Sequence, residues 1–380
     1  LLSKNRFSDE WFSDHLGRCQ MILLSSIINQ FKEALFHKYE TRLLPSHKKA
    51  LMRMQFCRTQ FSPQMLVRCS SDDCSNQSYI AHSCGHRSCP HCQNHESQQW
   101  IENQLNKRLP AKYYLLTFTL PRQFRGLVWQ NQRVVYQLLF SVINDVLMTF
   151  TQNDKKLKGR AGFTMVLHTH ARNLDYHPHI HIVMPGAAIN KQNRLWRVKS
   201  TKYLFDKSAL AIVFRAKFLQ ALVDAQLPLP KCYPKEWVAD CRAVGDGTKA
   251  IIYLGKYLYK GVIQEKDILS CQNGEVTFRY KASKSKTYQF KTVKGEDFLW
   301  LLVQHVLPKG FRKVRNVGFL NGCSKQLIKT LQVIFKIDPH RLLKKLKQRP
   351  EIRCRRCGAP MRIVQTMIHG LPYDTLPNLA

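Results

Sequence analysis

Two histidines alternate with isoleucines along one short segment, 177-HPHIHIVM-184. Residues two apart in a strand point to the same face, so His179 and His181 should project side by side while Ile180 and Ile182 enter a core. Two imidazoles on a rigid strand can hold a divalent cation and leave coordination positions open for a substrate. The alternative interpretation is a row of structural histidines on a half-exposed strand.

A third ligand is expected from the histidines that precede this strand. The segments Phe163–Thr169 and Pro178–Met184 read as strands joined by a loop, so their pairing would bring another imidazole to the same ion. We favour His168, and His170 and His177 are the competing candidates. No HExxH motif, with a glutamate directly after the first of two histidines one helical turn apart, occurs in the sequence, which argues against a zinc hydrolase of that type.

Two tyrosines one helical turn apart form a second candidate for chemistry, in 249-KAIIYLGKYLYKGV-262. Tyr253 and Tyr257 are at i and i+4, so both phenols share one face of a helix. A phenol, with a pKa of about 10, is a poor nucleophile unless a metal or a cation such as Lys260 offsets the developing charge. Spacing alone favours simple packing; the histidine strand and the charge of the chain favour a nucleophile.

Cysteines crowd one region, with six of the 13 between Cys57 and Cys92. Cys69 and Cys74 form one pair and 89-CPHC-92 forms another, and two pairs at this spacing fit a Cys₄ zinc site. Cys57 and Cys84 lie just outside, so a second zinc ion or another choice of four ligands stays open. The C-terminal pair 354-CRRC-357 supplies half a site, which either binds nothing or is completed from elsewhere.

The charge of the chain points to a polyanionic partner. Lys and Arg number 60 against 25 Asp and Glu, a formal net charge of +35 over 380 residues. Basic residues are spread along the whole length, which favours a long nucleic-acid track. Residues Arg58, Arg68, Arg87 and Lys107 surround the cysteine-rich segment and make DNA contact there plausible. We expect no membrane partner, because no uninterrupted run of 18 apolar residues occurs.

The chain around these motifs reads as helices, a zinc module and a mixed core. Apolar periodicity predicts helices within 8–48, 93–108, 128–152, 206–226 and 247–263, and strands at Tyr113–Leu120 and in a hairpin of Glu275–Tyr280 with Thr287–Thr292. Strands interleaved with helices predict an α+β core. We expect three domains: residues 1–106 helical plus zinc-binding, 107–296 catalytic, and 297–380 a helical region with the CxxC pair.

In this order, the motifs resemble the transposases of the insertion sequence 91 family, two-tyrosine members of the HUH (His-hydrophobic-His) class. The resemblance rests on 84-CGHRSCPHC-92, 116-LTFTLPRQFR-125, 167-LHTHARNLDYHPHIH-181 and 253-YLGKYLYK-260, and on the closing segments 298–320 and 354–361. There are departures: Cys69 and Cys74 are spaced wider than the usual CxxC, His170 and Ala171 replace an aromatic-Gly, and Tyr259 stands where Thr or His is common.

This resemblance implies a ferredoxin-like antiparallel sheet with the His strand central and the Tyr helix against it. It implies that His179 and His181 bind catalytic Mg²⁺ or Mn²⁺, and that Tyr253 and Tyr257 cut single-stranded DNA at element ends and keep the 5′ end as a phosphotyrosine. Zinc would be structural. We expect a bacterial cytoplasmic, nucleoid-associated enzyme; the alternatives are a relaxase or replication initiator of the same chemistry, or a non-enzymatic zinc-finger DNA-binding protein.

Overall fold

The structure is a computed structural model, and it describes residues 22–338 and 351–367. Within these ranges, residues 60, 191, 193, 194, 260, 283, 284 and 286 are not described, and Tyr259 and Met367 are described by their backbone alone. The first part of the predicted 8–48 helical segment therefore lies outside the described residues. So does Lys260, one of the expected catalytic residues.

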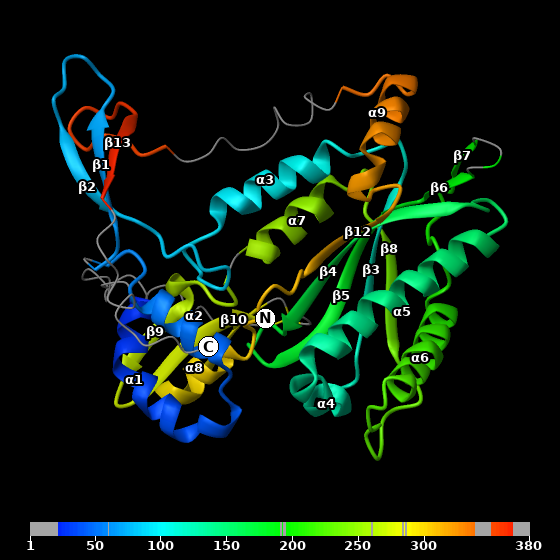
Figure 1. Ribbon diagram of the computed structural model, residues 1–380, viewed down its shortest axis with the longest axis horizontal. Helices are drawn as coiled ribbons and strands as arrows, with labels where there is room; N and C mark the ends of the chain where they lie inside the picture. Colours follow the sequence, from blue (N-terminus) through cyan, green and yellow to red (C-terminus); the bar gives the residue numbers. More distant parts are fainter. Residues whose placement is uncertain are drawn as a thin grey trace, which may run out of the picture.

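A seven-stranded antiparallel sheet forms the centre of the molecule (Figure 1). Its order is β7-β6-β4-β5-β3-β8, and β12 pairs with the free part of β4. The strands are β3 (Tyr113–Thr119), β4 (Arg160–His170), β5 (Tyr176–Pro185), β6 (Ala187–Asn190), β7 (Leu195–Val198), β8 (Val238–Ala243) and β12 (Val314–Gly318). The histidine strand β5 thus lies between β4 and β3, with neighbours on both sides that fix its register.

Helices cover both faces of this sheet. Those on one face are α4 (Arg125–Gln130), α5 (Gln132–Asn153) and α6 (Lys207–Asp224), and they share the largest apolar core with Ile180 and Ile182 of β5. Those on the other face are α3 (Asn94–Leu105) and α7 (Thr248–Tyr259), which pack with Val166 and Val183. Since side chains alternate in a strand, the odd-numbered residues of β5 face α7.

The helix α5 is the one described helix that is long and apolar enough to cross a membrane by length and composition. Its buried residues, among them Val135, Leu139, Ile143 and Val146, pack into the core beneath the main sheet. Its apolarity is therefore that of a helix packed on the core of the main sheet.

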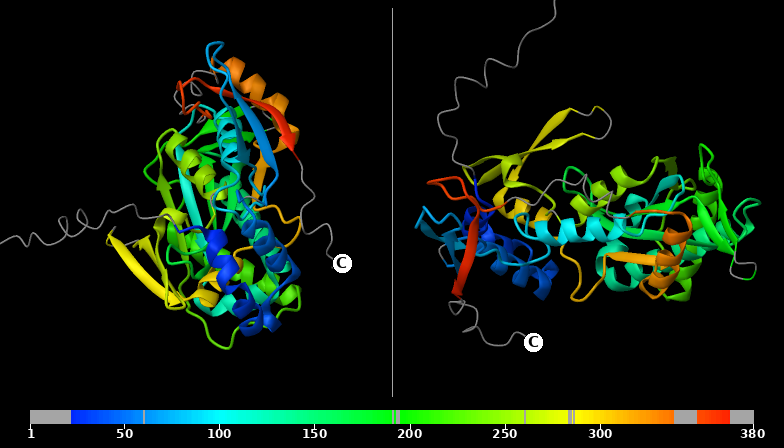
Figure 2. Two further views of the ribbon diagram at one scale, coloured as in Figure 1. Left: turned by 90° about the vertical axis from the view of Figure 1, so that its left-hand side faces the viewer. Right: turned by 90° about the horizontal axis from the view of Figure 1, so that it is seen from above.

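A second apolar core joins both halves of the chain. Its elements are α1 (Leu24–Lys38), α2 (Pro45–Gln55), α8 (Gly295–Val303), β9 (Ile268–Gln272), β10 (Glu275–Lys281) and β11 (Tyr288–Lys294). The last three strands form a separate antiparallel sheet in the order β11-β10-β9, and the hairpin β10–β11 projects from the body of the molecule (Figure 2). Pro45 starts α2 at its first turn, where the missing N–H costs nothing.

The third sheet brings the two ends of the chain together. It has the order β13-β1-β2, with β1 (Gln64–Cys69), β2 (Gln77–Ala81) and β13 (Met361–Met367). The remaining elements are α9 (Lys325–Ile334) and four short 3-10 turns, Glu40–Arg42, Arg122–Phe124, Glu265–Asp267 and Gly322–Ser324. All pairings in this sheet are antiparallel.

The mixed α+β class predicted from the sequence is confirmed, and the strongly periodic segments are helices and strands as expected. The predicted helix 128–152 is interrupted at Asn131, where α4 ends and α5 begins. The C-terminal region is less helical than expected, because β12 joins the main sheet and β13 joins β1. The domain boundaries at residues 106 and 296 stay a prediction: α1 packs on α8, and the boundary at 296 falls inside α8.

Candidate active site

Three histidines meet on the face of the main sheet that α7 covers. His179 and His181 lie on β5, and His168 on β4 is the register partner of His179. The ring centres of His168 and His181 are 4.5 Å apart, and the other two pairs are 4.8 and 5.3 Å apart. One nitrogen of each ring lies within 4.8 Å of the others. This arrangement suits three imidazole ligands of a single ion.

Hydrogen bonds leave one nitrogen of each ring available to a metal. His179 Nδ1 donates to the carbonyl oxygen of His177 at 2.7 Å, and His181 Nδ1 lies 2.9 Å from the hydroxyl of Thr117. In both rings Nε2 is then the free ligand atom, oriented by the bond on the other side of the ring. Nε2 of His168 is buried and has no hydrogen-bond partner. Burying an imidazole nitrogen without a hydrogen-bond partner costs free energy unless a ligand such as a metal ion binds to it. The three rings therefore fit a divalent cation.

Burial keeps these three imidazoles neutral. It lowers the pKa of His179 to about 4 and that of His181 to about 3. Burial, with the neighbouring His181, holds the pKa of His168 well below its usual value. Neutral imidazole is the form that binds a metal ion, so protons do not compete for these sites near neutral pH.

The other two candidates for the third ligand lie outside this cluster. The register of β4 against β5 shifts between His168 and His170, and the ring of His170 packs between Tyr257, at 5.7 Å, and His305, at 5.3 Å. His177 lies at the start of β5, where its Nδ1 is 3.3 Å from Arg125. The structure therefore brings His168 to the pair on β5.

The tyrosine helix α7 is held close to α3 by a glycine. A Cβ at Gly255 would lie 2.2 Å from the side chain of Ile101, so a larger residue would push the helices apart. The hydroxyl of Ser97 also donates to the Gly255 carbonyl at 2.9 Å. These contacts fix the height of α7 above the sheet and thereby the reach of its tyrosines.

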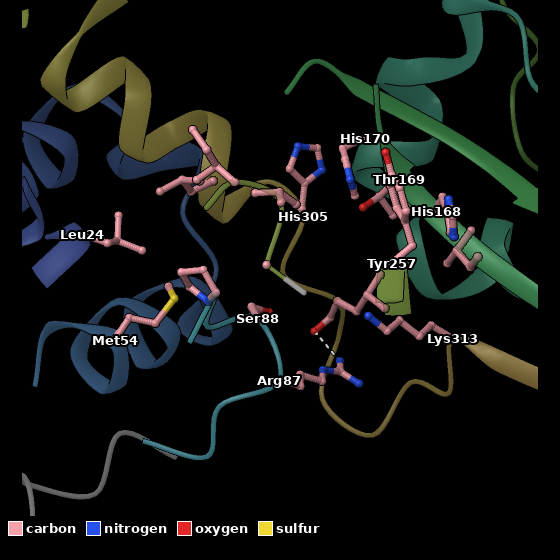
Figure 3. A pocket seen from close by; sticks show the side chains of 17 residues that line it. Leu24, Met54, Arg87, Ser88, His168, Thr169, His170, Tyr257, His305 and Lys313 are labelled. Atoms are coloured by element: carbon pink, nitrogen blue, oxygen red, sulfur yellow. Dashed lines mark hydrogen bonds between the residues drawn. The ribbon is translucent and has the colours of Figure 1, made fainter. Parts of the chain in front are cut away.

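Tyr257 lies directly against the histidine cluster. Its ring is stacked on His168, with 5.1 Å between the ring centres and 11° between the planes (Figure 3). Tyr253, one turn earlier, has its ring centre 4.9 Å from that of Tyr257 and is 40% exposed. Burial and the neighbouring Tyr257 raise the pKa of Tyr253 to about 12, so this phenol is protonated at neutral pH. Tyr257 thus lies between the histidine cluster and Tyr253.

A half-buried lysine that the sequence motifs did not single out borders the same site. Lys313 precedes β12, donates to the carbonyl of Leu258 near the end of α7, and lines a pocket of about 60 Å³ with His168, His170 and Tyr257. None of the described residues that line this pocket is acidic. A half-buried cation beside a pocket without carboxylates can bind an anion such as a phosphate group.

Replacing Lys313 by Met should remove a pH-dependent part of the stability. Burial lowers the pKa of Lys313 to about 8, below its value in the unfolded chain. The unfolded chain then binds more protons above pH 8, so the free energy of unfolding rises with pH there. From pH 7.5 to 9.5, the free energy of unfolding of the unchanged chain should rise by about 2 kcal/mol more than that of Lys313→Met, as measured by urea unfolding. Lys329→Met, at an exposed position of α9, is the control and should keep the pH dependence of the unchanged chain. If the free energy of unfolding of Lys313→Met followed the same pH dependence as that of the unchanged chain, the expectation would be refuted.

Four cysteines close to the active site form a compact cluster. The sulfur of Cys57 is 3.6 Å from those of Cys89 and Cys92, and Cys84 is 3.5 Å from Cys92. The expected set of Cys69, Cys74, Cys89 and Cys92 is therefore not what the structure brings together. Cys69 and Cys74 lie instead beside the C-terminal pair, because the β1–β2 hairpin carries them away from the CPHC turn.

This cysteine loop also braces the active site. Arg87 donates to the carbonyl oxygens of Leu307, Pro308 and Phe311, which lie just before Lys313. Gly261, just after α7, is so close to Pro90 that a Cβ would lie 2.7 Å from its backbone. Folding of the cysteine loop and placement of the tyrosine helix are thus connected.

Comparisons with known proteins identify the kind of protein to which this chain is similar. A transposase zinc-binding domain matches residues 27–120, and a putative transposase domain matches residues 162–327. The transposase for insertion sequence element IS801 of Pseudomonas savastanoi pv. phaseolicola is 27% identical over 360 residues, covering 86% of this chain and 85% of that protein. The chain belongs to the insertion sequence 91 family of transposases. The putative transposase y4qJ of Sinorhizobium fredii (strain NBRC 101917 / NGR234) is 28% identical over 325 residues, 79% of this chain and 80% of that protein.

No solved structure matches the transposase significantly. The zinc-binding match spans the cluster of Cys57, Cys84, Cys89 and Cys92, and both observations support a structural zinc ion in this part of the transposase. The putative transposase match spans all three clustered histidines, both tyrosines and Lys313.

Lys313 was not singled out from the sequence: it lies in the closing segment 298–320, and no spacing rule connects it to the tyrosine helix. Lys313 stands directly before the strand β12, whose sequence VRNVG is mixed and gives no signal of its own for this lysine. Arg87 was noted only as a basic residue beside the cysteines, and its contacts with the residues before Lys313 depend on the tertiary structure. Lys256, three residues after Tyr253 on the tyrosine helix, lines the groove next to Tyr253.

Proposed function

We propose that this transposase cuts and rejoins single-stranded DNA through a covalent 5′-phosphotyrosine, with a divalent cation held by His168, His179 and His181. The observation that carries the proposal is the stacking of Tyr257 on His168. Tyr257 and His168, a candidate nucleophile and a candidate metal ligand from distant parts of the chain, line one pocket, and phosphoryl transfer requires such proximity. A Mg²⁺ or Mn²⁺ ion bound there would polarise the scissile phosphate.

The side chains carry out the transfer itself. The phenol oxygen of Tyr257 forms a bond to phosphorus while the bond from phosphorus to the 3′ oxygen breaks. The phenol loses its proton and the departing 3′ oxygen gains one, which leaves a 5′-phosphotyrosine and a free 3′-OH. Attack by a 3′-OH of another strand reverses the step and joins the DNA. Lys313 offsets the negative charge of the phosphate, and Tyr253 takes the second cleavage.

A basic and aromatic groove next to the tyrosines supports single-stranded DNA as the substrate. It has a volume of about 430 Å³, and Tyr253 and Lys256 line it on one side with Arg172, Tyr280 and Lys281 on the other. Unpaired bases stack on aromatic rings while Lys and Arg contact the phosphates, and this combination is typical of single-strand binding.

The hairpin beside this groove extends the same surface. Tyr288 and Phe290 of β11 are 57% and 61% exposed, and Arg279 of β10 lies 5.1 Å over the ring of Tyr288. In the register, Phe290 is opposite Arg279 and Tyr288 is opposite Lys281, so all four share one face. We infer that DNA flanking the cut, at the element ends, passes along this face in the bacterial cytoplasm.

We also propose that the core is ferredoxin-like. The strands β8-β3-β5-β4 lie in this order, with α5 connecting β3 to β4 and α6 in the connection from β5 to β8. This is the β-α-β-β-α-β arrangement, in which each connected parallel pair has another strand between its members. It supports the central place of the histidine strand that the family resemblance implies.

The test is an adduct assay. The purified transposase is mixed with labelled single-stranded oligonucleotides carrying the element ends, with Mn²⁺ or with a chelator. We expect an adduct that survives denaturing electrophoresis, forms only with the metal, and maps to Tyr253 or Tyr257 by mass spectrometry. Binding of the DNA without any adduct would support the rival interpretation, a zinc-containing DNA-binding protein without this activity.

A further inference from the structure

Four cysteines from opposite ends of the chain form a second cluster, separate from the one beside the active site. Cys69 and Cys74 come from the β1–β2 region, and Cys354 and Cys357 come from the segment before β13. The sulfurs of Cys69 and Cys357 are 3.4 Å apart and those of Cys74 and Cys354 are 3.8 Å apart. All four sulfurs lie within 4.8 Å of one another.

These distances fit ligands of one metal ion and not two disulfides. Sulfurs in a disulfide are about 2.05 Å apart, well below both distances. Four thiolates around a tetrahedral zinc ion, each about 2.3 Å from the metal, are about 3.8 Å from one another. Both observed separations are close to this value, as are the distances of 3.5–3.6 Å in the first cluster.

Polar groups around the sulfurs also favour thiolates. The backbone amide of Ser71 lies 3.5 Å from the Cys69 sulfur and that of Arg356 lies 3.4 Å from the Cys354 sulfur. The side-chain amide of Asn76 donates to the same Cys354 sulfur at 3.2 Å. Donors directed at sulfur stabilise its negatively charged, metal-binding form.

The sheet that carries these cysteines has almost no apolar core of its own. The apolar cluster here consists of Cys69, Cys74 and Cys354, with only Ala359 and Met361 packed against it. On β13, Ile363 and Val364 are 57% and 52% exposed. Three short strands with so little burial need a covalent or metal link to hold together.

We propose that Cys69, Cys74, Cys354 and Cys357 bind a second structural Zn²⁺, which clamps the C-terminal segment onto the N-terminal zinc-binding region. The clamp closes the sheet β13-β1-β2 and completes a zinc site that neither end can form alone. This inference does not depend on the proposed DNA-cleavage mechanism, because none of its ligands belongs to that site.

Zinc content tests the clamp directly. The measurement uses a chain with His179→Ala and His181→Ala, so that metal at the histidines does not contribute, and elemental analysis after removal of loosely bound ions. We expect two zinc ions per chain, falling to one with Cys354→Ser and Cys357→Ser together. The matched control, Cys232→Ser with Cys323→Ser, replaces two exposed cysteines outside both clusters and should keep both ions. One ion in the starting chain, or two in the Cys354/Cys357 variant, would overturn the proposal.

A second measurement needs no folded cysteine variant. A site for a specific protease is introduced between α9 and residue 351, and the chain is cut after purification. We expect the C-terminal fragment to co-elute with the rest of the protein in gel filtration, and to separate when a strong chelator removes zinc. Separation before the chelator is added, or co-elution unaffected by it, would contradict a zinc-dependent clamp.

Discussion

A transposase carrying Tyr257→Phe should form the covalent DNA adduct at least about 10³-fold more slowly than the unchanged chain. Loss of the phenol oxygen removes the atom that bonds to phosphorus, whereas the ring and its stacking on His168 remain. Tyr257 is the tyrosine in contact with the histidine cluster, so we expect it to make the first cut. The rate is measured as the appearance of labelled adduct under single-turnover conditions with Mn²⁺.

Two further variants separate the role of Tyr257 from those of the other tyrosines on the helix. Tyr253→Phe should leave the first adduct within about tenfold of its rate and block the second cleavage, because Tyr253 has its ring against Tyr257. Tyr259 is two positions after Tyr257, a spacing that places it on a different side of the helix. The variant Tyr259→Phe should therefore change neither step. If Tyr253→Phe lost the first adduct while Tyr257→Phe still formed it at the unchanged rate, the proposed order of the two tyrosines would be reversed.

Replacing His179 and His181 by Ala together should lower the affinity for Mn²⁺ by at least about 10²-fold and bring DNA cleavage to background. Two of the three imidazoles would be lost, and His168 alone cannot hold the ion. Their hydrogen bonds to His177 and Thr117 end at backbone carbonyl and hydroxyl groups, so the strand should survive the change. Isothermal titration with Mn²⁺ and the adduct assay measure the two effects.

His177→Ala is the matched control for the histidine pair. His177 is on the same strand, but its imidazole contacts Arg125 and lies outside the cluster. Its removal should change the Mn²⁺ affinity by less than about tenfold. Unchanged Mn²⁺ binding in the double variant would show that the histidines do not hold the ion and would leave the stacked tyrosine without the proposed metal.

Several parts of the fold and site could be predicted because they depend on local spacing. The alternation of His179 and His181 with two isoleucines is a strand pattern, and β5 has it. The interval from Tyr253 to Tyr257 is one helical turn, and α7 contains both. The hairpin β10–β11 lies where its flanking strands were predicted.

Other parts could not be predicted because they depend on long-range pairing. Spacing suggested that Cys69 and Cys74 join Cys89 and Cys92, yet the hairpin between them sends each pair to a different cluster. The strands β8 and β12 are short, and their sequences differ little from loops until a neighbour supplies the hydrogen bonds.

The sequence by itself determined the kinds of chemistry available: alternating imidazoles, paired phenols, crowded thiols and a large excess of positive charge. Each is a local or compositional property, set by residue type and the repeat of a strand or a helix. The tertiary structure alone decided that His168 rather than His170 or His177 joins the pair on β5, that Lys313 faces the tyrosine helix, and which cysteines cluster together. These choices depend on strand register and on packing between distant segments, and neither leaves a pattern in the order of residues along the chain.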